Sequence, residues 1–367
     1  MLACARIDGS VSVHPCSGQN GTLIDINSNF NHIQVHDKQH PCRAVKFSGT
    51  GNLVFSSSTD GSLVGTDVET GKVVRNEKQA HQGHVINRLV NVSETLMASG
   101  DEVGCVKLWD TRQQLHEVAS ITPHEDYVSD IYPFDPQNSL LTVSGDGTLA
   151  NIDLRSKKLK NKSETDADDE LLSVTVIKSG RKIVCGTTSG VLNVWSWGYW
   201  NDCSDRFPGH PDSVTCLLKI DDDTILSASS DGLIRVLSVQ PNRMLGILGE
   251  HGDLDVERIS ASADQRLLAS MSHDSILKVW DLGQLIDTGS EEEPDNETGD
   301  DVDEKIRGED NKQGKQDIQA AKEDSDSDSE QEEERQRKRK KKGQHRIPTK
   351  ARHSGGESSS FFADLLS

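Results

Sequence analysis

Short runs of alternating apolar and polar residues recur along residues 1–286, and clusters of Gly, Asp, Asn and Ser separate these runs. Alternation of this kind is typical of a β-strand with one buried face, and the clusters between the runs are typical of tight turns. The pattern therefore predicts an all-β domain built from many short strands.

One sequence unit occurs seven times: a strand rich in small residues, a tight turn, and an alternating strand. Successive turns are 42 or 43 residues apart after a first interval of 52. A repeat of about 40–45 residues is typical of propeller blades with four strands each. The second turn positions are Gly9, Gly61, Gly104, Gly147, Gly190, Gly232 and Ser275.

A fixed site shortly after each turn holds Trp in three repeats, and Asp follows this site in four of the seven. A His stands upstream of four turns, twice as part of a Gly-His pair, Gly83-His84 and Gly209-His210. Gly-His, a turn Asp and Trp-Asp in this order are the mark of the WD repeat. We therefore predict a seven-bladed WD-repeat β-propeller over residues 1–286.

Each blade has two apolar faces that it cannot bury alone, so the blades must stack around a ring. Within a blade, the His, a strand Ser or Thr, the turn Asp and the Trp are expected to form a hydrogen-bonded chain that fixes strand register. The last repeat has the fullest set. The predicted members of this structural network are His84, Trp109, His124, Asp146, Trp195, His210, Asp231, His251, Ser272, Asp274 and Trp280.

The first repeat is predicted to be incomplete, because Met1–Ile7 already corresponds to the second strand of a blade. The inner strand of blade one is then missing, and so is the N-terminal strand that would complete the last blade. We interpret this as the product of a shortened gene model or an alternative start. Two polar stretches, 27–39 and 157–169, are expected to be loop insertions between blades.

The formal net charge of −20 is unevenly distributed. Residues 1–286 contain 37 acidic and 25 basic residues, which disfavours a globular domain that grips nucleic acid. Seven scattered cysteines without a Cys-x-x-Cys pair predict reduced thiols and no zinc site. No apolar stretch approaches the length of a membrane span. A soluble, intracellular protein without a membrane partner is expected.

Residues 287–367 lack the β pattern and are predicted to be disordered, because they contain too few apolar residues to offset the chain entropy. An acidic segment, 287–334, has a net charge of −16 and contains three serines among carboxylates that resemble acidophilic kinase sites. The candidate phosphorylation sites are Ser325, Ser327 and Ser329.

A basic segment, 335–353, has a net charge of +10. Its contiguous run fits a nuclear or nucleolar targeting signal, a weak RNA contact, or a solvated charge run that balances its acidic neighbour. We favour targeting. The final segment, 354–367, ends in the apolar cluster Phe361–Leu366, either a docking peptide or an inert end. The run consists of Arg337, Lys338, Arg339, Lys340, Lys341 and Lys342.

Motifs of nucleophilic, phosphate-binding, zinc-protease and calcium-binding sites are absent from the sequence. The trio Asp221–Asp223 lies between two predicted strands, where a hairpin turn is a better interpretation than a metal site. We therefore predict no enzymatic activity, no cofactor, no metal and no small-molecule substrate, and we expect proteins as partners.

One motif could contact a partner directly. Trp109, Asp110 and Arg112 form a Trp-Asp-x-Arg sequence, and Asp153 and Arg155 repeat it one blade later, with Ile in place of Trp. It resembles the box by which some WD-repeat proteins dock onto damage-specific DNA-binding protein 1, the adaptor of cullin-4 ubiquitin ligases. Arg after Trp-Asp is also common in propellers that bind no ligase, so both interpretations stay open.

Longer strings narrow the resemblance. They lie at 42–47, 98–112, 144–149, 169–174, 195–198 and 202–207, and none is a generic WD-repeat consensus. Over nearly the whole propeller the chain resembles the WD repeat-containing protein 55 family, its plant members most. The resemblance implies a nuclear, largely nucleolar protein that supports rRNA production and ribosome biogenesis, with pre-ribosomal proteins as partners. For plant members it also implies a cullin-4 substrate-receptor role.

Overall fold

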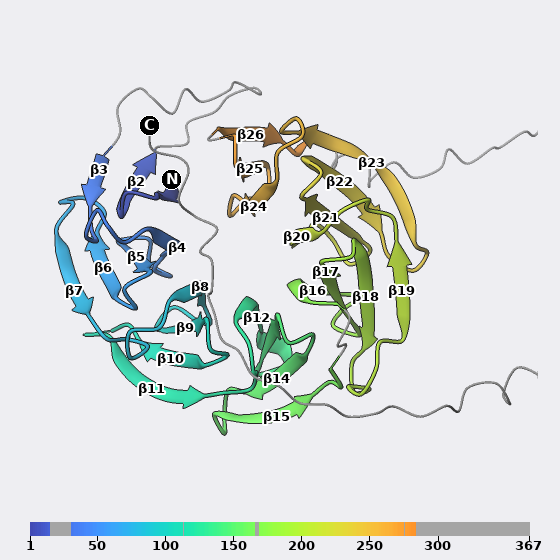
Figure 1. The fold of residues 1–367 in the computed structure, drawn as a ribbon, viewed down its shortest axis with the longest axis horizontal. Helices are drawn as coiled ribbons and strands as arrows, with labels where there is room; N and C mark the ends of the chain where they lie inside the picture. Colours follow the sequence, from blue (N-terminus) through green and yellow to red (C-terminus); the bar gives the residue numbers. More distant parts are fainter. Residues whose placement is uncertain (15–30, 113, 166–168, 275, 284–367) are drawn as a thin grey trace, which may run out of the picture. The chain divides into compact units, whose positions relative to one another are not determined.

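The structure is a computed structural model and describes residues 1–14, 31–112, 114–165, 169–274 and 276–283. Its strands form seven antiparallel sheets, which are arranged as the blades of a ring (Figure 1). The prediction of a seven-bladed, all-β propeller is confirmed. The only helical element with more than one residue in the described part is the short 3-10 helix η1 (Asp135–Gln137).

The first three blades consist of the following strands. Blade 1 contains β1 (Leu2–Ala5), β2 (Ser10–His14) and β3 (Asn31–Gln34); blade 2 contains β4 (Cys42–Phe47), β5 (Leu53–Ser58), β6 (Leu63–Asp67) and β7 (Val73–Glu77); blade 3 contains β8 (Ile86–Asn91), β9 (Leu96–Asp101), β10 (Val106–Asp110) and β11 (His116–Ile121).

The other four blades continue around the ring. Blade 4 contains β12 (Val128–Phe134), β13 (Ser139–Ser144), β14 (Leu149–Asp153) and β15 (Lys158–Lys162); blade 5 contains β16 (Leu171–Ile177), β17 (Lys182–Thr187), β18 (Val191–Ser196) and β19 (Asp205–Pro208); blade 6 contains β20 (Val214–Lys219), β21 (Thr224–Ser229), β22 (Leu233–Ser238) and β23 (Arg243–Glu250); blade 7 contains β24 (Val256–Ala261), β25 (Leu267–Ser272) and β26 (Leu277–Asp281).

The first and last blades differ from the other five, as predicted. In the described residues blade 1 starts at the strand that precedes the Asp8-Gly9 turn, so its counterpart of the inner strand β4 is missing. Within the described ranges blade 7 ends with β26, so no counterpart of the outer strand β23 is seen there. Five four-stranded sheets therefore lie between two three-stranded ones.

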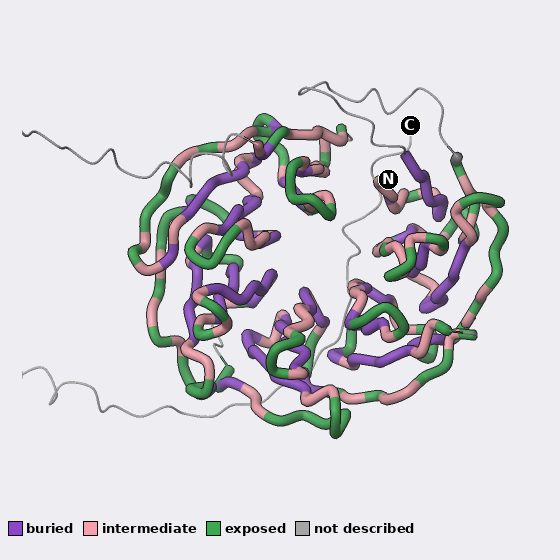
Figure 2. Tube along the Cα trace, turned by 180° about the vertical axis from the view of Figure 1, so that it is seen from behind, coloured by how far each residue is buried: buried purple, intermediate pink, exposed green. Residues whose placement is uncertain are grey.

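Apolar clusters join neighbouring blades and explain why the blades stack. Six clusters pair blade 1 with blade 2 and so on to blades 6 and 7. In the cluster between blades 4 and 5, for example, Leu141 and Leu149 meet Val174 and Trp195. Figure 2 shows burial concentrated in the middle strands of the blades and exposed residues along the outer strands. Each blade thus buries its faces against its neighbours.

The turn glycines connect each blade closely to the next one. Gly104 has a positive φ of 80°, which glycine adopts without strain. A β-carbon there would lie only 2.4 Å from the carbonyl oxygen of His124 in blade 4. Glycine at this position therefore serves both the turn and the contact between blades.

The predictions of loop insertions at residues 27–39 and 157–169 were both wrong in part. Residues 158–162 form the outer strand β15, which pairs with β14 through Ala150–Lys162 and Asn151–Asn161. Residues 31–34 form β3. Both strands are rich in polar residues because an outermost strand presents one edge to solvent, where charged side chains are favoured. The polar composition was mistaken for a loop signal.

Candidate protein-binding surfaces and the blade network

Blade 3 contains a complete hydrogen-bonded chain of four side chains. The indole Nε1 of Trp109 donates to Ser99 Oγ at 2.7 Å, and Ser99 Oγ lies 2.6 Å from His81 Nε2. His81 Nδ1 lies 2.7 Å from Asp101 Oδ2. Because the carboxylate only accepts, His81 Nδ1 donates to it and Ser99 donates to His81 Nε2. All four residues are buried, so the chain satisfies polar groups that would otherwise be unpaired.

His84 was predicted to occupy the histidine position of this chain, and this prediction was wrong. Its side chain is 45% exposed and lies 3.7 Å from Glu102 Oε1. His81 and His84 flank the same turn, and the Gly83-His84 pair drew attention to the second of them. Only His81 lies in the strand-facing interior, where Ser99 and Asp101 of β9 can reach it.

Blade 7 contains the same chain. Trp280 Nε1 donates to Ser270 Oγ at 2.8 Å, His251 Nε2 lies 2.7 Å from the same oxygen, and His251 Nδ1 lies 2.7 Å from Asp274 Oδ2. Ser272 was predicted for the serine position, and this prediction was wrong. Ser272 Oγ donates to the carbonyl oxygen of Leu254 at 3.1 Å instead.

Blade 4 replaces the indole and the serine while keeping the histidine. His124 Nδ1 lies 2.8 Å from Thr148 Oγ1, and His124 Nε2 lies 2.8 Å from Thr142 Oγ1. Thr148 donates to Asp146 at 2.5 Å. Burial alone would raise the pKa of Asp146, but hydrogen bonds from His124 and Thr148 outweigh it and hold this pKa well below its usual value. Ile152 fills the Trp position by apolar packing.

Blade 6 uses its turn aspartate differently. His210 Nε2 lies 2.8 Å from Ser227 Oγ, but Asp231 pairs with Arg235, whose Nη1 donates to Asp231 Oδ1 at 3.0 Å. Nδ1 of His210 is consequently without a hydrogen-bond partner in the described part of the molecule. Leu237 occupies the Trp position of this repeat. Asp231 was predicted to join the histidine chain, and this prediction was wrong because Arg235, which was not predicted, takes the carboxylate.

Blade 2 has a histidine that sequence reasoning also missed. His36 bridges Ser62 Oγ and Ser56 Oγ, each at 2.9 Å. Burial lowers the pKa of His36. The strand position of the bridging hydroxyl recurs with the same period as the turns, and this was the signal that could have found it. Its occupants in blades 2 to 7 are Ser56, Ser99, Thr142, Cys185, Ser227 and Ser270.

Blade 5 breaks the chain at this position. Cys185 stands where the other blades have a hydroxyl, and burial raises the pKa of its thiol well above the usual value. Nε1 of Trp195 is buried and, among the described residues, has no hydrogen-bond partner. Trp195 therefore contributes to blade 5 by packing in the apolar cluster with blade 4 rather than by a hydrogen bond.

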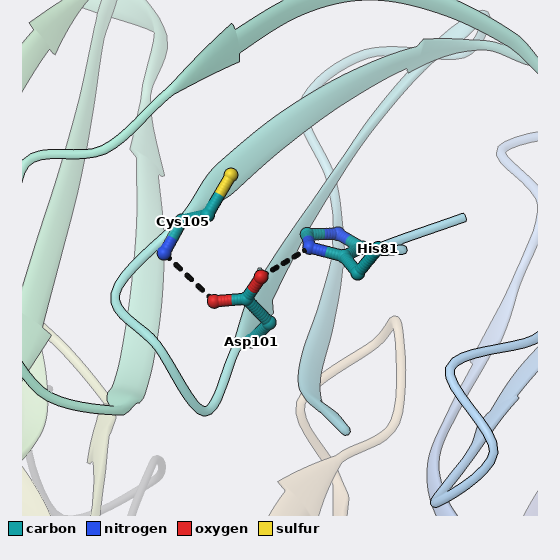
Figure 3. A group of neighbouring side chains, drawn as sticks. All are labelled: His81, Asp101 and Cys105. Carbon is teal, nitrogen blue, oxygen red and sulfur yellow. Dashed lines mark hydrogen bonds and ion pairs between the residues drawn. The ribbon is translucent and has the colours of Figure 1, made fainter. Parts of the chain in front are cut away.

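Three potential metal ligands meet in blade 3, where Figure 3 shows Asp101 between His81 and Cys105. Their ligand atoms lie within 4.8 Å of one another. Both ring nitrogens of His81 already have partners, and Asp101 Oδ1 accepts from the Cys105 and Val103 amides at 2.7 and 3.1 Å. Burial raises the pKa of the Cys105 thiol, which disfavours the thiolate that a metal needs. The group fits a structural role better than a metal site.

The aspartate trio lies in the turn between β20 and β21. Asp221 Oδ1 accepts from the amides of Asp223 and Thr224, each at 2.7 Å. Asp222 and Asp223 pair with Lys219 and Lys178, each at 2.5 Å. The carboxylates thus serve the turn and its link to blade 5, as the hairpin interpretation requires.

The two Asp-x-Arg sequences follow the third strands of blades 3 and 4. Arg112 folds back on Asp110, its Nε donating to both carboxylate oxygens at 3.0 Å, although its side chain is 69% exposed. Hydrogen bonds from Arg112 lower the pKa of Asp110 to about 2. Arg75 of β7, missed from the sequence, donates to the carbonyl oxygens of Thr111 and Arg112 and fixes this segment.

Arg155 is exposed in the equivalent position of blade 4, and its amide donates to Asp153 Oδ1 at 2.7 Å. The Ser156 amide donates to the same oxygen at 3.0 Å. We call Asp110, Arg112, Asp153 and Arg155 the Arg rim. It offers two accessible guanidinium groups on neighbouring blades.

The outer strand of blade 6 presents apolar side chains to solvent. Met244, Leu245 and Ile247 of β23 are 46%, 54% and 59% exposed. Exposed apolar residues that cluster on one strand are typical of protein contact surfaces.

The tail predictions lie outside the described residues. They comprise the segments 287–334, 335–353 and 354–367, the serines at 325, 327 and 329, and the basic run 337–342. In the described part of the chain, none of the helical segments has the length and apolar character to cross a membrane.

Seven blades, with a His-Ser-Asp-Trp chain complete in two of them, define the class of WD-repeat β-propellers, which act as protein-interaction scaffolds. The profile of the WDR55 family matches residues 1–285, and the chain belongs to this family.

Relatives from plants, animals and fungi agree with this assignment. WD repeat-containing protein 55 of Arabidopsis thaliana is 39% identical over 290 residues, 78% of each chain. The Homo sapiens protein of the same name is 35% identical over 78% of this chain and 72% of its own. WD repeat-containing protein JIP5 of Coprinopsis cinerea is 36% identical over 69% of this chain and 64% of its own.

A solved structure supports the fold alone. A chain of the structure titled "Crystal Structure of Mitotic Checkpoint Complex" superposes with a TM-score of 0.66 at 17% identity and covers 76% of this chain and 87% of its own.

Proposed function

We propose that this protein is a non-enzymatic scaffold of the nucleus and nucleolus that supports rRNA production and ribosome biogenesis by binding pre-ribosomal proteins. The observation that carries the proposal is the match to the WDR55 family across the whole propeller, residues 1–285. The chemistry of the blades agrees with it, because their buried His, Asp and Ser side chains are engaged in structural hydrogen bonds.

Localisation and RNA processing test this proposal. A tagged full-length protein is expected in the nucleolus, and deletion of residues 335–342 is expected to reduce its nuclear signal. Depletion of the protein should lead to accumulation of unprocessed pre-rRNA. A cytoplasmic signal from the intact chain, together with normal pre-rRNA after depletion, would refute the proposal.

A second candidate function is that of a substrate receptor of a cullin-4 ubiquitin ligase that docks on damage-specific DNA-binding protein 1. The Arg rim favours it, because Arg112 and Arg155 are exposed on adjacent blades and a guanidinium binds carboxylate and carbonyl groups in a fixed geometry. A partner that takes Arg112 must compete with Asp110, which already holds it.

The two functions are separable by affinity purification of the full-length protein. If the protein is a substrate receptor, changing both Arg112 and Arg155 to Ala abolishes recovery of the adaptor. The control Arg243→Ala, on the outer strand of blade 6, leaves recovery of the adaptor unchanged. If the protein acts in ribosome biogenesis, pre-ribosomal proteins are recovered equally with the wild type and with both variants. Adaptor recovery that does not respond to the Arg rim variant would refute docking through this surface.

A further inference from the structure

The innermost strands carry an unusual set of side chains at equivalent positions. The register of each inner strand shifts after its first residue, which inserts a bulge and re-aims the following side chain. Figure 1 shows these strands surrounding the ring axis. The residues directly after the bulges are Ala44, Arg88, Asp130, Ser173, Cys216 and Arg258, and Lys46 stands two positions after Ala44.

Three of these side chains, those of Lys46, Arg88 and Arg258, are positively charged. Burial lowers the pKa of Arg88, and the neighbouring charge of Arg258 lowers it further, although the two residues belong to the non-adjacent blades 3 and 7. Burial and the charge of Arg88 likewise lower the pKa of Lys46 in blade 2. Arg88 and Arg258 both directly follow the bulges of their inner strands, which places them at equivalent positions around the ring axis.

The carboxylate of Asp130 lies beside these cations, and both of its oxygens already accept hydrogen bonds. Asp130 Oδ1 accepts from Arg88 Nε at 2.9 Å, and Asp130 Oδ2 accepts from the Val174 amide at 3.1 Å. Arg258 Nη1 lies 3.6 Å from the Cys216 sulfur. Among the described residues, neither Lys46 nor Arg258 forms an ion pair with a carboxylate.

Burial alone would lower the pKa of Arg258, but the neighbouring Cys216 sulfur and the Asp130 and Glu257 carboxylates raise it. Glu257, next to Arg258 in the chain, is 56% exposed and pairs with His273 at 2.7 Å. Three cations and one carboxylate therefore leave two positive charges near the axis. This excess stands out in a propeller with 37 acidic and 25 basic residues over 1–286. A bound anion stabilises positive charges that face one site, because an opposite charge favours their charged forms.

We propose that Lys46, Arg88 and Arg258 form a binding site for a phosphate-class oxyanion on the ring axis, which accepts inorganic phosphate or the phosphate groups of an inositol polyphosphate. Two guanidinium groups supply rigid, paired donors that match phosphate oxygens, and the ammonium group of Lys46 adds a mobile point charge. Asp130 positions Arg88 and keeps the net charge of the site at two.

The test uses the full-length protein and two double variants of equal charge change. Lys46→Gln with Arg258→Ser removes two of the cations, and serine fits there because Ser173 occupies the same position in blade 5. Lys72→Gln with Arg266→Ser is the control, since both residues are exposed and lie away from the inner strands. Binding of inorganic phosphate and of inositol hexakisphosphate is measured by isothermal titration calorimetry, and the Tm is measured with and without each compound.

The wild-type and control proteins are expected to bind one equivalent with a rise in Tm, and affinity should weaken as KCl increases. The Lys46/Arg258 double variant should bind at least about tenfold more weakly, since it loses two charge-assisted contacts. Binding of both compounds assigns the site to a single phosphate, and binding of inositol hexakisphosphate alone assigns it to a polyphosphate.

Two results would overturn the proposal: absence of binding of either compound to the wild-type protein, or equal affinity in the wild type and the Lys46/Arg258 variant. The single variant Lys46→Gln guards against a folding defect, because glutamine keeps most of the length of the side chain and Lys46 takes no part in the hydrogen-bonded chain of its blade. This variant should bind more weakly than the wild type. Without ligand, its Tm should equal that of the Lys72/Arg266 control variant. Unchanged affinity in this variant removes Lys46 from the site and also counts against the proposal.

Discussion

Ser99 connects Trp109 to His81 in blade 3, so its hydroxyl is the best place to test the blade network. In Ser99→Ala the indole Nε1 and the imidazole Nε2 both lose their partner, at 2.7 and 2.6 Å in the native chain. Ser99 is fully buried, so water cannot replace the hydroxyl. A buried polar group left unpaired costs about 1–3 kcal/mol, so two such groups set the expected loss at about 2–6 kcal/mol.

Thermal unfolding of the full-length protein measures this loss. For a domain of this size, 1 kcal/mol lowers Tm by roughly 2–4 °C, so Ser99→Ala should lower Tm by roughly 4–24 °C. Ser272→Ala is the matched control, because among the described residues Ser272 Oγ bonds only to backbone groups, the Leu254 carbonyl at 3.1 Å and the Asp274 amide at 3.4 Å, and to no side chain of the Trp-Ser-His-Asp chain. Its Tm should fall by roughly a third as much or less. Equal shifts in the two variants would refute the view that the chain stabilises the blade.

Three further predictions concern the incomplete chains. Cys185→Ser gives Trp195 Nε1 the acceptor that Trp109 has, and should raise Tm by roughly 1–4 °C, measured by calorimetry; a lower Tm would show that the indole does not point at this position. Arg235→Ala leaves the partly buried Asp231 carboxylate without its cation and should destabilise blade 6 by about 3 kcal/mol. Hydrogen exchange in β21 and β22 should become faster, and unchanged exchange would contradict the role of this pair. Burial lowers the pKa of His124, so the unfolded chain takes up protons more readily; stability should be constant above about pH 6.5 and fall below it, and His124→Gln should flatten the decrease of Tm with pH.

The sequence by itself determined the repeat, and with it the fold class. A period of 42–43 residues in the turns fixes the number of blades, because each unit has two apolar faces that only neighbouring units can cover. It also predicted that the first and last blades lack a strand, and in the described residues these two sheets have three strands each. The Trp positions and the turn aspartates were found for the same reason, since they recur with the turns.

Tertiary structure decided which of several similar residues takes part in a network. His81 and His84 lie three residues apart beside one turn, and Ser270 and Ser272 lie on the same face of one strand. Local pattern cannot separate such pairs, because the choice depends on how far the indole and the turn aspartate reach across the sheet. In the structure His81 lies within hydrogen-bond distance of Ser99, and Ser270 lies within hydrogen-bond distance of Trp280.

The charged cluster on the ring axis depended on the tertiary structure entirely. Lys46, Arg88 and Arg258 are separated by up to 212 residues, and each is unremarkable within its own strand. They become neighbours only because closing the ring points the inner strands of different blades at one axis, and no pattern within a single repeat contains that information.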